Sequence, residues 1–535
     1  MDDIHSRRFI KALKLEEQKQ SDKFLKGERQ DNYKFIFERP VTTQKLDLSD
    51  LNIVEIENLQ TFHKTPKLAH NLNMILKQPG NVFPVEEMMK LQKDKESADF
   101  LKNIVQPDQV DFNAMPPYIP PSQDELLLNF AKESNINFIM STSTISLVLA
   151  QLYYLFSNFR NPSFDKISSA YDNEPKKYMI SQRKPITNML RRIDKDKNIY
   201  ALDSDSGLFK YSNMILMDLG KVMENQYCLD PETFKKTLMK GHIDPDAVLD
   251  TDHHRFMRLN NNICLRAQID CQDVDENGNP FVFEIKTRAL CPMRYDLNNY
   301  LDYMDYVVNQ RSGIHSSFER EYYDMIRGAF LKYTFQLKIG RMDGAFVAYH
   351  NTKEAVGFEY VKTKEIERRI FGNSTYADTA FIICSKLLTT VLNLILDDLK
   401  GEDFEQLKIG YYSCSHYKRM VIFVELFNEK TEWGSSGLIQ QTNEIKDEYD
   451  YYTKYKKFEN TVYKYEFHVY PYINGVLQRS NNFNLNEYDQ IDVEYKFKKL
   501  GKAGFLDYMN FLHEAYKFET INLDLNYVGA WVKNF

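Results

Sequence analysis

The amino-acid sequence predicts an α/β fold in which a mixed sheet is flanked by helices, with an N-terminal arm and a β-rich C-terminal accessory region. Helical and strand patterns alternate through the middle of the chain, which is typical of an α/β core. Short alternating strands follow, such as Met420–Leu426 and Val462–Tyr470, and Asn474-Gly475 after the second one predicts a hairpin turn. A charged, Tyr-rich segment between them, Lys446–Asn460, is expected to form a loop.

The composition is that of a globular protein with more than one hydrophobic core. The chain has 535 residues, of which 43% are hydrophobic, and this suffices for roughly two to four domains. Its net charge of −7 provides no global attraction for nucleic acid, so any binding of phosphates must come from local patches. The six cysteines include no C-x-x-C pair, which argues against a structural zinc site and against a disulfide scaffold.

A cluster of prolines marks the first domain boundary. Four prolines between residues 116 and 121 precede a helix that Ser122 and Asp124 are expected to open. We therefore divide the chain into three regions: a charged N-terminal arm (1–110), an α/β core (111–370) and an α+β accessory region (371–535).

Two apolar stretches could be mistaken for membrane spans. Ile145–Phe156 has only about half of the roughly 20 residues that a span needs, and Lys386 interrupts Phe381–Leu396. Both are therefore predicted to be buried helices, and no transmembrane helix is expected. The N-terminus carries charges of both signs, including Asp2 and Asp3, and is a poor match to a mitochondrial presequence.

The segment Leu265–Arg288 carries the strongest chemical signal. Side chains of a strand alternate between its two faces, and both halves of this segment alternate between apolar and polar residues. The polar face of the first half contains Asp270, and that of the second half contains Glu284 and Lys286. An Asn-Gly turn lies between the halves, so we expect a hairpin that presents these three side chains on one side.

This spacing suits metal-dependent phosphodiester hydrolysis, the chemistry of PD-(D/E)xK nucleases, whose restriction-endonuclease-like core is a mixed sheet flanked by helices. Asp270 and Glu284 offer hard oxygen ligands for Mg²⁺ or Mn²⁺, which polarises a phosphoryl oxygen and lowers the pKa of a bound water. Lys286 would position that water or offset charge that builds on the phosphorus. The E-x-K spacing is needed because it puts both side chains on one face of the strand.

Two other interpretations of the same residues stay open at this point. The polar face could be a solvated strand surface with an ordinary salt bridge. Asp273, Asp275, Asn277, Gly278 and Glu284 also match the pattern of an EF-hand calcium loop. The strand-like flanks argue against an EF-hand, because that motif needs a helix on each side.

Two helices are expected to complete the site. Asn213–Tyr227 is predicted as a helix in which Gly220 allows close approach to a sheet and so places Glu224 near the metal. The alternative is that this glutamate is an ordinary surface residue. Ser317–Lys338 has an apolar stripe at spacings of three and four, and Gln336 extends that stripe onto the buried face, where an amide needs partners.

Candidate contacts to nucleic acid come from basic residues. Arg320 and Arg327 share another face of the second predicted helix, where a simple solvated face is the alternative. The segment Pro175–Arg192 is basic and lacks acids, so it predicts either a nucleic-acid track or a solvated loop. The candidate nucleic-acid-binding residues are Arg183, Lys184, Arg191, Arg192, Arg288, Arg320 and Arg327.

Several motifs resemble those of Pet127, a yeast-type family of mitochondrial RNA-processing proteins. The matching stretches run in family order from about residue 116 to residue 365 and include LGKVMEN, RAQIDC, FEIKTRA and FEREYYDMIRGAFLKY. The last of these is highly specific, whereas the C-terminal part is similar more loosely and the first hundred residues hardly at all. By motif position, the family's active-site residues correspond to Asp270, Glu284, Lys286, Glu224 and Gln336.

The resemblance implies a PD-(D/E)xK fold and a metal-dependent 5′→3′ exoribonuclease that processes and degrades mitochondrial RNA from its 5′ end. The implied cofactor is Mg²⁺ or Mn²⁺, held by Glu224, Asp270 and Glu284, and the implied substrate is single-stranded RNA. It also implies peripheral membrane association at the matrix face of the inner membrane, with the mitochondrial transcription machinery as a further partner. Glu284 is a departure, since family members carry Asp there, but the superfamily accepts either carboxylate.

Two functional alternatives remain. One is a non-catalytic RNA-binding or transcription-partner module on a nuclease fold. The other is a DNA exonuclease on the same fold, because a metal site acts on phosphates and does not itself distinguish the sugars.

Overall fold

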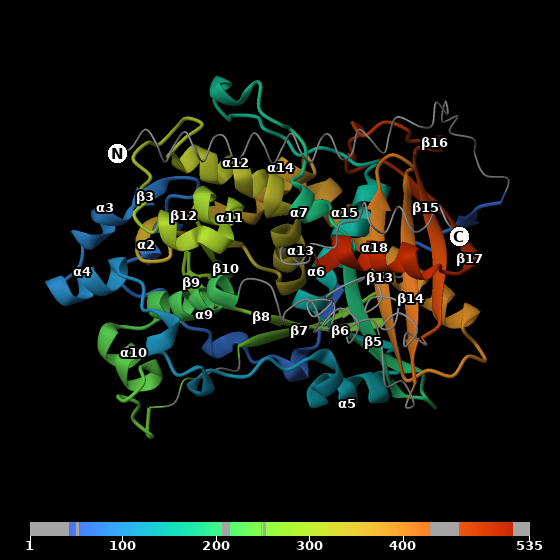
Figure 1. Ribbon diagram of the computed structural model, residues 1–535, viewed down its shortest axis with the longest axis horizontal. Coiled ribbons are helices and arrows are strands. Elements are labelled where there is room, and N and C mark those ends of the chain that lie inside the picture. Colours follow the sequence, from blue (N-terminus) through green and yellow to red (C-terminus); the bar gives the residue numbers. More distant parts are fainter. Residues whose placement is uncertain are drawn as a thin grey trace, which may run out of the picture.

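The computed structural model describes residues 42–49, 53–205, 214–247, 249, 253–275, 277–428 and 460–516, in which two mixed sheets are covered by helices (Figure 1). The α/β class that the sequence predicts is confirmed. In Figure 1 the C-terminal strands lie on the right and the smaller sheet on the left.

The larger sheet has 12 described strands, and it joins segments from all three predicted regions. Its order is β1 (Gln44–Lys45), β17 (Ile491–Lys502), β15 (Val462–Ile473), β14 (Arg419–Phe427), β13 (Gln406–Cys414), β5 (Ile186–Asp194), β6 (Ile199–Ser204), β4 (Phe138–Ser141), β8 (Ile263–Gln268), β7 (His254–Leu259) and β2 (Ile53–Glu55), with β16 (Val476–Leu477) on β15. Because β13 pairs with β5, the sheet crosses the predicted boundary at residue 370. The division into domains stays a prediction.

The predicted C-terminal strands are confirmed as β14 and β15. Asn474 and Gly475 have positive φ angles of 50° and 76°, as a tight hairpin turn between β15 and β16 requires. Residues 446–459 of the predicted loop lie outside the described residues.

The smaller sheet has five described strands and contains the E-x-K motif on a central strand. Its order is β3 (Val82–Pro84), β12 (Ala355–Lys362), β11 (Gly344–His350), β10 (Pro280–Ala289) and β9 (Cys271–Val274). The β10–β11 pair is parallel and the other pairs are antiparallel. A central strand is buried on both faces, and accordingly Val282, Phe283, Glu284 and Ile285 are all buried.

Helices cover both sheets. They are α2 (Asn73–Leu76), α3 (Val85–Met89), α4 (Lys95–Lys102), α5 (Glu125–Ser134), α6 (Thr142–Phe156), α7 (Ile180–Arg183), α9 (Met214–Cys228), α10 (Pro231–Leu238), α11 (Cys291–Tyr295), α12 (Phe318–Gly328), α13 (Phe330–Gly340), α14 (Thr363–Ile370), α15 (Ser374–Asp398) and α18 (Phe505–Tyr516). The predicted opening of α5 is confirmed for Asp124, whose carboxylate accepts a hydrogen bond from the N–H of Leu127 at 3.2 Å.

The two predicted apolar helices are confirmed as α6 and α15, which pack against each other. Among the described helices α15 is the one long and apolar enough to cross a membrane by length and composition, with a mean hydropathy of 1.9. However, 61% of its apolar window is buried inside the protein, as for a core helix.

Two expectations about local structure are wrong. The predicted hairpin begins with β9 rather than with Leu265, because β8 belongs to the larger sheet and the chain changes sheets near Asp270. Alternation with a period of two assigns residues to the two faces of a strand, but it does not reveal which sheet the strand joins.

The predicted helix Ser317–Lys338 is broken at Ala329, where φ is −140°, into α12 and α13. Gly328 has the weakest helix propensity of the ordinary residues, and a Cβ there would lie 2.8 Å from the sulfur of Met179. Glycine therefore lets the segment before α7 approach the end of α12.

Candidate active site

Strand β10 carries the first part of the candidate active site. Glu284 and Lys286 share a face with Arg288, because alternate residues of a strand point the same way. Their in-register neighbours on β11 are Ala345, Val347 and Tyr349. These neighbours belong to the same core cluster as Phe330 of α13, so the polar row lies on the sheet face that α12 and α13 cover.

Asp270 is held next to this row by the backbone of β10. Its Oδ2 accepts a hydrogen bond from the N–H of Ile285 at 2.9 Å. The carboxylate is thus fixed beside Glu284, although the two residues are separated by the β9–β10 turn. The structure confirms that the sequence brings these two acids together, even though Asp270 precedes β9 instead of lying on a longer hairpin strand.

Lys286 is the direct partner of Glu284. Its ammonium group donates a short hydrogen bond to Oε1 of Glu284 and lies 5.4 Å from the ring centre of Tyr333 on α13. Burial lowers the pKa of Lys286, but the charges of Glu284 and Asp270 outweigh burial and raise it. Lys286 therefore stays protonated.

Helix α9 brings Glu224 to the same place, as predicted from Gly220. A Cβ on Gly220 would lie 3.3 Å from Oγ1 of Thr287 on β10, which is a tight contact. Burial raises the pKa of Glu224 to about 7, with the charge of Glu284 adding to the effect and Lys286 opposing it. This glutamate is consequently not the ordinary surface residue of the alternative interpretation.

The three carboxylates repel one another. Burial raises the pKa of Asp270 well above its usual value, and Glu284 and Glu224 raise it further, while Lys286 lowers it. Within the part of the chain that the structure describes, no three His, Cys, Asp or Glu side chains are grouped tightly enough to hold a metal ion as they stand. The acids therefore sense each other's charge without forming a closed ligand set.

Helix α13 contributes two polar side chains. The side-chain oxygen of Gln336 is buried and has no hydrogen-bond partner among the described residues. One turn earlier, Lys332 has its pKa lowered to about 8 by burial and by Lys286, with Glu284 opposing. The sequence analysis missed Lys332, although its position four residues before Gln336 puts both on one helix face.

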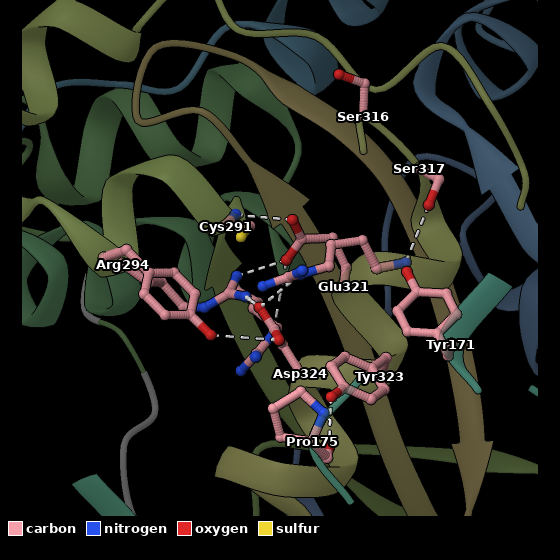
Figure 2. Close-up of polar contacts among 12 residues, drawn as sticks. Tyr171, Pro175, Cys291, Arg294, Ser316, Ser317, Glu321, Tyr323 and Asp324 are labelled. Carbon is pink, nitrogen blue, oxygen red and sulfur yellow. Dashed lines mark hydrogen bonds and ion pairs between the residues drawn. The ribbon is translucent and has the colours of Figure 1, made fainter. Parts of the chain in front are cut away.

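Arg288, Arg320 and Arg327 come together around Glu321 and Asp324 in a buried ionic cluster next to the row on β10. They are 8%, 7% and 7% exposed, so the solvated face that was the alternative for Arg320 and Arg327 is wrong. Figure 2 shows Arg294 directed towards Glu321 and Asp324, which lie on α12. Helix α12 thus buries its charged side chains Arg320, Glu321, Asp324 and Arg327 instead of exposing them to solvent.

The remaining basic candidates lie in different surroundings. Arg191 and Arg192 are on β5 of the larger sheet, where Arg191 pairs with Asp203 at 2.7 Å and Arg192 lies 4.0 Å from the ring centre of Phe404. The carbonyl of Tyr178 accepts a hydrogen bond from Arg183 at 3.1 Å. Since residues 186–192 are a sheet strand, a solvated loop over the whole segment is wrong, and the nucleic-acid track stays a prediction.

Lys184, next to Arg183, lies between α7 and β5, where its carbonyl accepts a hydrogen bond from the side chain of Gln151 at 2.9 Å.

The EF-hand interpretation is wrong, because β9 and β10 flank the Asp275 turn. In that turn, Asp275 Oδ1 accepts hydrogen bonds from the N–H groups of Asn277 and Asn279.

Comparisons with known proteins give the relatives of this chain. The family model described as "Mitochondrial protein Pet127" matches residues 118–393. The "mRNA degradation protein pet127, mitochondrial" of Schizosaccharomyces pombe is 30% identical over 353 residues, covering 64% of this chain and 63% of the relative. The "Putative mitochondrial translation system component PET127" of Saccharomyces cerevisiae is 31% identical over 322 residues, covering 57% of this chain and 38% of the relative. The chain thus spans less than two thirds of the length of these curated relatives.

Two solved structures are distantly similar. K. lactis Dxo1 in complex with manganese has a TM-score of 0.33 and 10% identity, covering 74% of this chain and 93% of that chain. Scheffersomyces stipitis Rai1 in complex with (3'-NADP)+ and calcium ion has a TM-score of 0.30 and 10% identity, covering 76% and 98%. The family assignment rests on the sequence comparisons: the family model covers just over half of the residues, and the chain belongs to the Pet127 family.

Proposed function

We propose that this chain is a metal-dependent 5′→3′ exoribonuclease of the PD-(D/E)xK type that processes and degrades mitochondrial RNA. The observation that carries the proposal is the meeting of Asp270, Glu284, Glu224 and Lys286 beside one strand, on which the N–H of Ile285 fixes Asp270. Three acids and one lysine at a largely buried place destabilise the fold, because one positive charge does not compensate three carboxylates that are partly removed from water.

The donor chemistry of these residues fits a divalent cation. Carboxylate oxygens are the ligands that Mg²⁺ and Mn²⁺ prefer. Burial first, and then the charge of Glu284, raise the pKa of both Asp270 and Glu224, and a bound cation would offset both effects. Glu224, Asp270 and Glu284 would hold it, in competition with the Lys286–Glu284 ion pair. When bound, the cation supplies a Lewis acid that polarises the phosphoryl oxygen and acidifies a water.

The other residues have roles that follow from their chemistry. Lys286 keeps its proton and places a positive charge beside the reacting phosphate, where it stabilises developing negative charge. Gln336 has a buried oxygen without a partner, which makes its amide available to orient a water or a substrate hydroxyl. Tyr333 fixes the position of Lys286 through its ring.

The biological setting is carried over from the relatives. One is named as a mitochondrial mRNA degradation protein, and this supports RNA turnover in mitochondria as the setting. The 5′→3′ polarity follows from the family resemblance alone. Peripheral association with the inner membrane at the matrix face and contact with the transcription machinery stay predictions.

The proposal is tested with a 3′-labelled, 5′-monophosphorylated RNA and purified protein in Mg²⁺ or Mn²⁺, beside EDTA and beside Asp270→Asn. The wild-type protein is expected to degrade the RNA in the presence of the metal. The RNA should stay intact when EDTA is added or when Asp270→Asn replaces the wild type. A matched DNA strand and an RNA labelled at the opposite end determine the sugar preference and the polarity.

The second candidate is a non-catalytic RNA-binding module, which is favoured by the absence of a closed three-ligand group among the described residues. Tight binding of intact RNA by folded wild-type protein in every metal would select this function and reject the nuclease.

A further inference from the structure

We propose that Arg288, Arg294, Arg320 and Arg327 form a phosphate-binding subsite, which takes a phosphate group of the RNA next to the one that is cleaved. The proposal deepens the proposed function and rests on it. The ligand chemistry is a phosphate oxyanion, supplied either by the 5′ end or by the RNA backbone.

The cluster is assembled from three elements. Arg288 comes from β10, Arg294 from α11, and Arg320 and Arg327 from α12. Figure 2 shows Arg294 next to Glu321 and Asp324, the two acids of α12, with Tyr323 nearby. The ring of Tyr323 also packs against two of the arginines: its centre lies 5.0 Å from the guanidinium of Arg327 and 5.7 Å from that of Arg320.

The positive charges outnumber the negative ones. Arg294 pairs with Asp324 at 2.8 Å and also with Glu321. Arg288 lies 4.0 Å from Glu321, and Arg320 lies 3.4 Å from Asp324. Among the described residues no carboxylate lies within ion-pair distance of Arg327. Three guanidinium groups thus share two carboxylates, and Arg327 adds a fourth positive charge. A buried excess of charge is costly unless a ligand of opposite sign offsets it.

Two of the guanidinium groups make no hydrogen bond through Nε. The Nε atoms of Arg288 and Arg320 lie 4.0 Å from Glu321 and 3.4 Å from Asp324, and neither has a hydrogen-bond partner among the described residues. Both side chains are more than nine-tenths buried. Guanidinium forks match phosphate oxygens in a bidentate manner, so these donors are suited to an oxyanion.

The cluster adjoins the candidate active site on one side and the surface on the other. Arg288 is two residues after Lys286 and lies on the same face of β10. Arg294 is 18% exposed at its side chain, and Arg327 Nε donates to the carbonyl of the exposed Lys177 at 3.0 Å. A continuous line of cations therefore leads from the catalytic row to the start of the basic segment.

Arg327 is the residue that separates a ligand site from a structural ion-pair network. Removing Arg294 or Arg320 would take one of its two arginine partners from Glu321 or Asp324, so loss of stability would follow under either interpretation. Arg327 has no such carboxylate, and its loss leaves every ion pair of the cluster intact. Arg368→Gln on α14 is the matched control, because it removes an arginine that pairs with Glu365 outside the cluster.

The experiment measures the affinity of the full chain for a 3′-fluorescent RNA in EDTA, so that no cleavage occurs, with a 5′-phosphate or a 5′-hydroxyl and at several salt concentrations. Arg327→Gln is expected to raise Kd about tenfold and to reduce the salt dependence by about one ion, while Arg368→Gln leaves both unchanged. Loss confined to the 5′-phosphorylated RNA assigns the terminal phosphate, and equal loss for both RNAs assigns a backbone phosphate.

Folded Arg327→Gln with wild-type affinity and salt dependence would overturn the subsite. If this variant does not fold, the wild-type melting temperature is followed in inorganic phosphate against chloride of equal ionic strength. A saturating rise supports the subsite, and a rise that is only linear, as for non-specific salt stabilisation, contradicts it.

Failure of the proposed function is distinguishable from failure of the subsite. Wild type that binds RNA through Arg327 but cleaves it in neither Mg²⁺ nor Mn²⁺ keeps the subsite and rejects the nuclease. Wild type that cleaves while Arg327→Gln binds normally keeps the nuclease and rejects the subsite. Absence of RNA binding by wild type overturns both.

Discussion

Two charged clusters meet on β10, and they are unbalanced in opposite directions. At Glu284 and Lys286 three carboxylates surround the lysine, and burial together with the neighbouring acids raises the pKa of Asp270 well above its usual value. At Arg288 four arginines surround two carboxylates. Burial would raise the pKa of Asp324 as well, but Arg320 and Arg294 outweigh it and lower the pKa.

The difference indicates what each cluster binds. A balanced buried ion pair is complete by itself, whereas an excess of either sign calls for a ligand of the other sign. The acidic cluster is therefore suited to a cation and the arginine cluster to an anion. A metal-dependent reaction on a phosphate chain needs both, side by side.

Removal of the divalent cation is expected to have the largest effect. RNA cleavage should fall by roughly 10²- to 10⁴-fold in EDTA, because the acidic cluster then lacks its counter-charge.

Glu224→Gln should raise the Mn²⁺ concentration for half-maximal rate about tenfold or more, as measured by initial rates over a Mn²⁺ titration. Asp273→Asn, on β9 of the β9–β10 hairpin, is the control. Equal Mn²⁺ dependence of wild type, Glu224→Gln and Asp273→Asn would contradict the assignment of the cation to the acidic cluster.

Asp324→Asn should destabilise the fold by about 3–5 kcal/mol, because it leaves the arginines of the second cluster without one of their two counter-charges. Denaturant unfolding measures this loss. Asp378→Asn is the matched control, since Asp378 pairs with Lys338 but is 63% exposed at its side chain. Equal stability of the two variants would show that the arginine cluster does not depend on its acids.

Glu359 on β12 provides a third way to bury a carboxylate, without an arginine. Burial raises its pKa to about 7, while the hydroxyl of Tyr349, which donates to it at 2.7 Å, lowers it. The unfolded chain loses this proton first, near the usual value of 4.5, so the wild-type stability contributed by Glu359 falls between about pH 4.5 and 7.

Glu359→Gln removes this pH dependence. Its stability relative to wild type should rise across that interval by up to about 3 kcal/mol and then stay constant at higher pH. Chemical denaturation at several pH values measures the difference. A difference that does not change with pH would mean that Glu359 is ionised in the folded protein.

Gly220→Val should have the smallest effect on stability, about 1–3 kcal/mol, because its side chain would collide with Thr287 where α9 meets β10. The RNA cleavage rate should fall more than stability suggests, since α9 also positions Glu224. Gly504→Ala is the control, because a Cβ there meets nothing within 4 Å. Unchanged activity in folded Gly220→Val would separate Glu224 from the acidic cluster.

The acidic cluster was accessible to sequence reasoning because its signals are local. Alternation puts Glu284 and Lys286 on one face, and a glycine one turn before Glu224 predicts a close helix–strand approach. Lys332 was equally accessible, through its position one turn before Gln336, but it was overlooked.

The arginine cluster was not accessible in the same way. Arg320 and Arg327 lie on the helix face that an amphipathic pattern assigns to solvent, and their burial depends on α11 and on the segment before α7. These contacts join residues about 30 to 150 positions apart in the chain, such as Arg294 with Asp324 and Arg327 with Lys177. For the same reason the pattern did not reveal that β8 and β9 belong to different sheets.

The central claim is that the acidic cluster cleaves RNA, and Lys286→Ala tests it most directly. The measurement is the single-turnover cleavage rate of a 5′-monophosphorylated RNA in Mn²⁺, beside the melting temperature and beside Lys353→Ala, a surface lysine, as control. We predict that Lys286→Ala loses roughly 10²- to 10⁴-fold in rate while remaining folded, and that the control keeps its rate. Cleavage by folded Lys286→Ala at the wild-type rate would contradict the account.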